Sequence, residues 1–151
     1  MNVNGTKELE ASREVVWSVI NDPAQMAGLM PGVEGFEIKD DRHWQAKVKV
    51  PLGLGGLKMT IDFEKLEERA PEFASMNAKG KGVGAMMNMT TSFTLTGEGE
   101  HTSMAWQADV SIAGAVGSMG QRVLQPIINQ QVGNVLTALE VKVAEAKAAA
   151  A

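Results

Sequence analysis

Four segments between residues 43 and 112 alternate between apolar and polar side chains, and this alternation limits the fold more than any other feature. The segments span residues 43–50, 57–68, 85–97 and 101–112. Successive side chains of a strand point to opposite faces, so a period of two predicts a strand with one buried face and one wet face. Together the four segments predict an antiparallel sheet with one wet face.

Three weaker strands are expected at residues 3–10, 33–39 and 72–80, the last without a register that the sequence fixes. Short connections at DDR, GKGVG and GEGE predict hairpin turns between consecutive strands. The sheet therefore has about seven strands, six of them consecutive in the chain.

Two short helices follow the first strand. Ser12 is a good N-cap, and an apolar side containing Val16 and Val19 carries the first helix to residue 20. Asp22-Pro23 ends that helix and begins a second one over residues 23–30, with Asp22 as N-cap and proline in the first turn. Pro31-Gly32 then stops a helix of only two turns.

A long helix is predicted from about residue 114 to residue 148, with Pro126 as a kink in its interior. Its apolar stripe changes direction at the proline, so we expect the two halves to face different surfaces. The first stripe comprises Val116, Met119, Val123 and Ile127 and is expected to face the short helix 23–30. The second, expected to lie on the sheet, comprises Leu124, Ile128, Val132, Val135, Leu139 and Val143.

These elements predict an α+β fold, in which one curved antiparallel sheet wraps on a long C-terminal helix. Residues 1–145 are expected to form a single domain and residues 146–151 a frayed or disordered alanine-rich tail. A helix about 10 Å across cannot fill the concave face of such a sheet. The chain has only seven aromatic residues but ten methionines, so we expect an apolar hollow that accepts an apolar ligand.

The expected ligand site consists of inward-facing side chains of the sheet, the underside of helix 23–30 and the facing part of the long helix. Helix 23–30 is interpreted as a lid over one end of the hollow. The candidate ligand-binding residues are Met26, Leu29, Met30, Trp44, Val48, Met59, Ile61, Phe63, Met76, Met87, Met89, Phe93, Trp106, Val123 and Ile127.

Polar contacts to a ligand are expected from Asn77, Asn88 or Gln131, without a basis for choosing among them. Leu52, Leu54 and Leu57 lie at an expected hairpin tip in PLGLGGL (51–57), where they either fold back on the core or contact a membrane, a partner or the mouth of the hollow.

Composition argues against several classes of function. The net charge of −4 has no basic block, which argues against nucleic-acid binding. The chain has no cysteine, no zinc-binding HExxH motif and no GxSxG motif, and its histidines, His43 and His101, lie at expected turns, so no metal site and no catalytic residue are predicted. Without a signal-like N-terminus or an 18-residue apolar run, a cytoplasmic location is expected.

The segment VWSVINDPAQMAGLMPGVEGFE resembles the signature of the carbon monoxide dehydrogenase G-subunit (CoxG) family, within the START-like helix-grip (SRPBCC) superfamily. Val16-Trp17, Asp22-Pro23 and Pro31-Gly32 fall at the family's spacing, and the GKGVGAM turn and the GSMGQRV stretch extend the resemblance over residues 2–143. The resemblance implies a helix-grip fold with a ligand cavity between sheet and helix.

The resemblance also implies a role beside a molybdenum hydroxylase of the carbon monoxide dehydrogenase type. There the protein would link enzyme to membrane by handling a quinone, such as menaquinone, or another lipid, with peripheral contact at the inner face of the membrane. Two alternatives stay open, namely an enzyme of the polyketide-cyclase or hydrolase kind and an adaptor protein with an empty cavity. The first needs an acid–base pair in the cavity, and no inward-facing titratable residue appears in the alternation.

Overall fold

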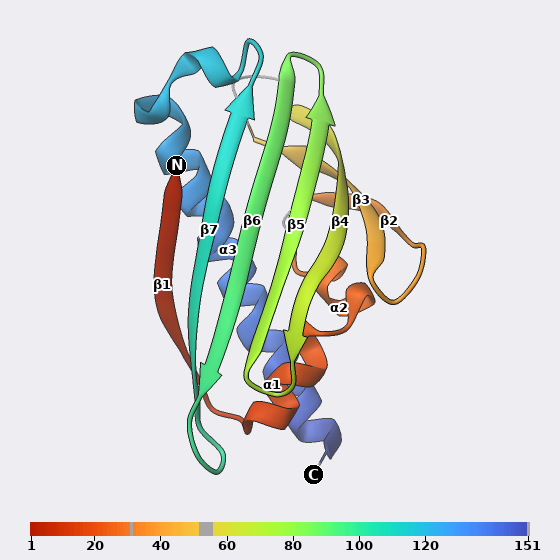
Figure 1. Ribbon diagram of the computed structural model, residues 1–151, viewed down its shortest axis with the longest axis vertical. Helices are drawn as coiled ribbons and strands as arrows, with labels where there is room; N and C mark the ends of the chain where they lie inside the picture. The colour runs from red at the N-terminus through yellow and green to blue at the C-terminus, as the bar shows by residue number, and fades with distance from the viewer. Residues whose placement is uncertain (31, 52–55, 151) are drawn as a thin grey trace.

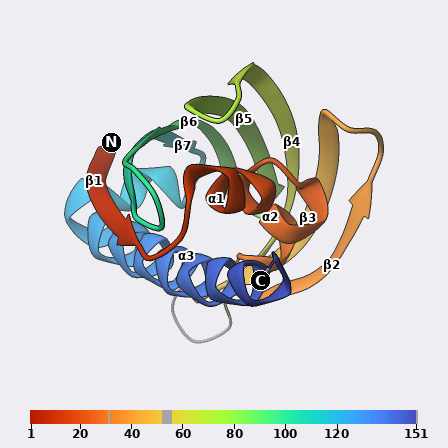
Figure 2. The ribbon, with the colours of Figure 1, turned by 90° about the horizontal axis from the view of Figure 1, so that it is seen from below.

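A computed structural model of the protein describes residues 1–30, 32–51 and 56–150. Leu52 and Leu54 therefore lie outside the described residues. One antiparallel sheet curves around a single long helix (Figures 1 and 2), in the order β1-β7-β6-β5-β4-β3-β2. The strands are β1 (Asn2–Leu9), β2 (Val33–Ile38), β3 (His43–Val50), β4 (Leu57–Arg69), β5 (Phe73–Gly82), β6 (Ala85–Thr96) and β7 (Thr102–Ala113).

The helices are α1 (Arg13–Ile20), α2 (Pro23–Gly28), a 3₁₀ turn η1 (Gly117–Met119) and α3 (Gln121–Ala150). Seen from below in Figure 2, α3 lies across the open side of the curved sheet, and α1 and α2 close one end. The first strand lies beside the last, since β1 pairs with β7. The other five pairings each join strands that are consecutive in the chain.

The predicted alternation is confirmed in the central strands. In β3 the side chains of Trp44, Ala46 and Val48 are buried while Lys47 and Lys49 are exposed. The register of β5, which the sequence left open, turns Ala74, Met76, Ala78 and Gly80 inward. The buried faces of these strands thus look toward α3.

The caps of both short helices are confirmed. The Ser12 hydroxyl accepts from the Val15 backbone N–H at 3.3 Å, and Asp22 accepts from the Ala24 N–H at 3.0 Å. Pro23, at the first position of α2, has no N–H that would need a partner.

The predicted start of the long helix is wrong, whereas its predicted end, at about residue 148, lies within two residues of the observed one. Residues 114–120 form a turn, η1 and a break at Gly120, whose φ of 85° is outside the helical region, so α3 begins at Gln121. The expected frayed tail is helical as far as Ala150, because Ala146 packs on the core and Lys147 Nζ donates to the Glu10 carbonyl at 2.8 Å. The helix runs continuously through Pro126.

The buried side chains form three clusters. One joins α1, the C-terminal half of α3 and the lower ends of β1, β6 and β7, with Leu139 and Val143 at its centre. A second lies under α2 against β3, β4 and β5, and a third joins β1, β7 and the N-terminal half of α3. The first cluster fills one end of the molecule, and the other two lie along the space between the sheet and α3.

Candidate functional site: an apolar cavity

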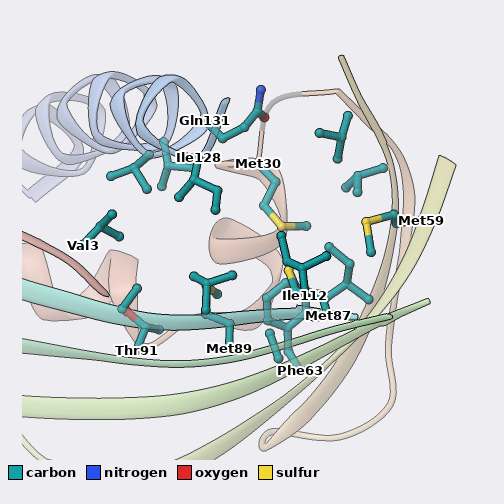
Figure 3. Close-up of a pocket in the computed structure, with 18 of the residues that line it drawn as sticks. Val3, Met30, Met59, Phe63, Met87, Met89, Thr91, Ile112, Ile128 and Gln131 are labelled. Carbon is teal, nitrogen blue, oxygen red and sulfur yellow. The ribbon is translucent and has the colours of Figure 1, made fainter. Parts of the chain in front are cut away.

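A cavity of about 290 Å³ lies between the concave face of the sheet and α3. Figure 3 shows its walls: Met59, Phe63, Met87 and Met89 project from the sheet, and Ile128 projects from α3. Met30 projects from the end of residues 21–30, which contain α2 and are called the α2 segment below. The volume is far above that of a single bound water, and the lining is almost wholly apolar. Such a space stays dry and favours an apolar ligand.

Fourteen of the fifteen residues predicted at the ligand site line this cavity; their contact with a ligand stays a prediction. They come from the α2 segment, five strands and α3. They are Met26, Leu29, Met30, Trp44, Val48, Met59, Ile61, Phe63, Met76, Met87, Met89, Phe93, Trp106 and Ile127.

Val123 was placed wrongly, since 44% of it is exposed and it is absent from the lining. The cause is the helix start. Because α3 begins at Gln121 rather than at residue 114, Val123 lies in the first turn, where its neighbour Leu124 takes the inward position and is only 4% exposed. Met119, from the same predicted stripe, is also exposed, whereas Val116 lines the cavity.

The sequence prediction also omitted much of the cavity wall. Most of the missed residues have the same period as the predicted ones, on strands or on the inward stripe of α3, so the signal was present; Val116 instead lies in the turn before η1. They are Val3, Val50, Ala78, Ala85, Thr91, Ala108, Val110, Ile112, Val116, Leu124, Ile128, Val132, Val135 and Leu136. Leu57, one of the leucines of the expected hairpin tip, also lines the cavity.

Polar groups are few in the lining. Gln131 lines the cavity as expected, with its amide end turned away from the sheet in Figure 3. Thr91 is the other polar residue, and its hydroxyl is already used as a donor to the Gln107 carbonyl at 2.7 Å. Asn77 and Asn88 were placed wrongly, because they lie on the outer face and hydrogen-bond to each other at 3.1 Å.

Two indole N–H groups in the cavity wall have no hydrogen-bond partner among the described residues. They belong to Trp44, whose ring stacks on Phe63 with centroids 5.3 Å apart, and to Trp106. A buried donor without a partner costs about 1–3 kcal/mol. Most buried polar groups of native proteins are paired, so these two donors are exceptions. Both nitrogens are covered by neighbouring atoms of the wall.

The α2 segment is held by one charged contact that the sequence did not reveal. Lys65 points inward from β4, is 9% exposed, and donates through Nζ to the Asn21 carbonyl at 2.7 Å and to the Asn21 side chain at 3.1 Å. It also pairs with Glu68 at 3.0 Å. A cation at the C-terminal end of α1 satisfies a free carbonyl there, so Lys65 fixes the point from which α2 departs.

The titratable groups that are most conspicuous in the sequence lie away from the cavity. His43 and His101 are both about half exposed and pair with Asp40 and Glu8, respectively. The backbone N–H of Arg42 and then the His43 ring hold the pKa of the Asp40 carboxyl below its ordinary value. None of the described residues lining the cavity carries an ionisable side chain.

Within the described ranges, no group of three histidine and acidic residues is placed to hold a metal ion. None of the described helices is both long enough and apolar enough to span a bilayer.

Solved structures with the same fold are numerous, and the three described next are distant in sequence. A conserved protein from Geobacillus kaustophilus matches with a TM-score of 0.88 at 21% identity over 96% of both chains. A START superfamily protein from Mycobacterium smegmatis matches at 0.74 and 16% identity, over 95% of this chain and 97% of the other. The Zhui aromatase/cyclase from Streptomyces sp. R1128 matches at 0.70 and 16% identity, over 97% and 93%.

These likenesses show the START-like fold alone, because every identity is below 25%. A comparison with curated protein sequences gives no match. A family model does match, and it covers residues 5–144, nearly the whole chain. The expectation drawn from the VW, DP and PG pairs is thereby confirmed, and the chain belongs to the carbon monoxide dehydrogenase G-subunit (CoxG) family.

Proposed function

We propose that the protein is a non-catalytic binding protein that carries an isoprenoid quinone, such as menaquinone, for a molybdenum-containing enzyme of the carbon monoxide dehydrogenase type at the membrane. The observation that carries the proposal is the cavity of about 290 Å³ with an almost entirely apolar lining. Burial of apolar area at about 25 cal/mol per Å² gives such a site affinity without any charged contact.

Two further features support a quinone as the ligand. A quinone presents two carbonyl oxygens, which accept hydrogen bonds and donate none, and the cavity wall holds the unpartnered indole N–H groups of Trp44 and Trp106. The family name links the chain to carbon monoxide dehydrogenase, an enzyme that must pass electrons onward. The accessory role rests on that name.

The second candidate is an enzyme of the cyclase kind, favoured by the fold likeness to the Zhui aromatase/cyclase. General acid–base catalysis requires a titratable group within hydrogen-bond reach of the substrate. The described lining offers Thr91 and Gln131 as its polar side chains, and the Thr91 hydroxyl is already committed. The lining therefore supports binding better than catalysis.

The first test is native mass spectrometry of the protein purified from its own host, where a bound mass equal to that of a quinone is expected. A titration of the apo protein with a short-chain menaquinone follows, monitored by the fluorescence of Trp44 and Trp106, which a quinone in the cavity quenches. No bound mass together with no saturable quenching would refute the carrier function.

A matched pair of variants locates the site. Met30→Asp combined with Ile127→Asp places charges in the cavity wall and should abolish quinone binding. Met86→Asp combined with Val141→Asp makes similar changes at side chains that are 59% and 54% exposed, and should leave binding unchanged. Equal affinity of the two doubly substituted proteins would contradict the assigned cavity.

A further inference from the structure

A groove of about 470 Å³ runs between β1 and α3, and we refer to it as the seam. We call its apolar lining residues the floor; they are Val3, Trp106, Val132 and Leu136. We call its polar lining residues, together with Gly133, the rim; they are Asn2, Asn4, Gln125, Asn129 and Gly133. We propose that the seam is the binding site for an uncharged, hydrogen-bonding head group of the ligand whose apolar body fills the cavity. This inference rests on the proposed function and adds to it the place and the chemistry of the head group.

The seam shares a wall with the apolar cavity. All four floor residues of the seam also line the cavity, so a single layer of side chains separates the two spaces. Val3 lies in this wall in Figure 3. A ligand whose apolar body fills the cavity reaches the seam with its polar end when a side chain of the shared wall moves aside.

The β1 wall of the seam offers unpaired backbone groups. The Met1 ammonium donates to the Val110 carbonyl, and the Val110 N–H donates to the Met1 carbonyl, both at 2.7 Å, which makes this an exchanging pair beside β7. In an antiparallel ladder only alternate residues bond to a given neighbour, so the N–H and C=O groups of Asn2 and Asn4 point away from β7. β1 is an edge strand of the described sheet, and these groups face the groove.

The α3 wall of the seam carries two carboxamide side chains and, at Gly133, a position without a side chain. Gln125 and Asn129 lie one helical turn apart, and Gln125 Nε2 donates to Asn129 Oδ1 at 3.1 Å. That bond leaves the amide nitrogen of Asn129 as a donor without a partner among the described residues. One turn further along, Gly133 has nothing within 4 Å of where a Cβ would be, so the groove stays open there.

Trp106 supplies the link between the floor and the polar rim. Its ring lies over Gly5 of β1, where an added Cβ would come within 2.9 Å of the indole and 3.4 Å of its nitrogen. The indole N–H is buried in this shared wall, with no partner among the described residues. A small shift of the ring toward the groove would allow the N–H to donate to an acceptor atom of a ligand.

The chemistry of the seam selects an uncharged group. None of its nine lining residues has an ionisable side chain. Two charges near the β1 wall are already engaged, since the Met1 ammonium donates to the Val110 carbonyl and Lys7 Nζ pairs with Glu140 Oε2 at 2.6 Å. A lining of uncharged donors and acceptors suits a carbonyl or a hydroxyl, whereas a carboxylate would lose its hydration without gaining a cation from the lining.

The test is displacement of the neutral dye N-phenyl-1-naphthylamine, read by the emission of the dye. Three competitors share a long alkyl body: 2-decyl-1,4-benzoquinone has a neutral carbonyl head, decylbenzene has none, and dodecanoate has a charged head. Wild-type protein should bind the quinone about tenfold more tightly than decylbenzene, since one hydrogen bond of this kind changes affinity by about that factor. Dodecanoate should bind more weakly than the quinone.

The variants separate the seam from the cavity. Gln125→Leu with Asn129→Leu, and separately Trp106→Phe, should each weaken quinone binding by about tenfold while decylbenzene changes less than about twofold. The matched control is Gln130→Leu with Asn134→Leu, the same exchanges on the same helix at residues outside the seam, and should behave as wild type. Circular dichroism verifies that each variant is folded.

Each outcome is decisive for one of the two proposals. If the quinone and decylbenzene bind equally well, or if the seam variants match their control, the seam is not the head-group site although the cavity binds. If dodecanoate binds most tightly, the assignment of an uncharged head is wrong. If no competitor displaces the dye from wild-type protein and the menaquinone titration also fails, the carrier function itself is refuted.

Discussion

Replacing Ala108 by leucine should stabilise the apo protein and block the cavity. Ala108 lies at the middle of β7, is 6% exposed and faces the cavity between Val3 of β1 and Thr91 of β6. The change adds three carbon atoms, and burying them contributes about 0.8 kcal/mol each, or about 2.4 kcal/mol. Fixing the leucine rotamer costs roughly 0.5–1 kcal/mol, which leaves about 1.5 kcal/mol.

For a chain of this length that gain raises the melting temperature by about 3–6 °C. The assay is differential scanning calorimetry of the apo protein, followed by the quinone titration. Ala105→Leu is the matched control, because Ala105 lies on the same strand but is exposed on the opposite face. Ala105→Leu should change the melting temperature by no more than about 1 °C, since exposed substitutions are close to neutral. It should leave the affinity for quinone unchanged.

The reasoning is refuted if Ala108→Leu lowers the melting temperature by several degrees, because that would mean the space around Ala108 is already filled. It is refuted equally if the variant is stabilised and still binds quinone with wild-type affinity. In that case the ligand would occupy a different part of the molecule.

Three further predictions concern the supporting structure. Gly5→Ala should destabilise the protein by about 1–3 kcal/mol in urea unfolding, because the new Cβ would lie 2.9 Å from the Trp106 ring. Lys65→Met should cost about 1–3 kcal/mol by the same measurement, since the Asn21 carbonyl loses its donor. The pKa of the Asp40 carboxyl should lie below its ordinary value of 3.8 in an NMR pH titration. Because the folded pKa is depressed, the contribution of Asp40 to stability is present above pH 3.8 and is lost as the pH falls through the folded pKa.

The chain offers a matched control for each of the two substitutions. Gly133→Ala has open space for its Cβ and lies in a helix, so it should stabilise by up to about 1 kcal/mol. Lys58→Met replaces an exposed lysine of β4 and should be close to neutral. The contact assigned to Gly5 would be contradicted if Gly5→Ala lowered the free energy of unfolding no more than Gly133→Ala does. The contact assigned to Lys65 would be contradicted if Lys65→Met and Lys58→Met changed the free energy of unfolding equally. An Asp40 titration at or above 3.8 would contradict the hydrogen bonds to it.

The strands and the inward residues could be predicted because they depend on local information. Period-two alternation states which face of a strand is buried, and it placed residues such as Trp44, Ile61 and Met89 correctly in the cavity wall. The caps of α1 and α2 were equally local, since Ser12 and Asp22 bond to residues only two or three positions away.

The errors arise where tertiary contacts or backbone freedom decide. Periodicity alone continued the long helix back to residue 114, whereas Gly120 breaks it, and this displaced Val123 from the site. Lys65 is a charged residue at an inward position of β4, and its partner Asn21 is 44 positions away. The seam could not be expected either, since it depends on the pairing of β1 with β7, which are separated by about a hundred residues.

The cavity persists because the sheet presents small side chains where a stable core would present large ones. Ala78 and Ala108 lie in its wall, and Gly80 lies beneath the ends of Met59 and Met87, whose methyl groups would approach an added Cβ to 2.8 and 3.4 Å. Methionine adapts its shape at little cost, so these side chains can close on the space or yield to a ligand. An empty apolar space of this size reduces stability, because its lining loses dispersion contacts. A ligand that fills it should therefore raise the unfolding temperature in proportion to the logarithm of its concentration, and Ala108→Leu should remove that dependence together with the binding.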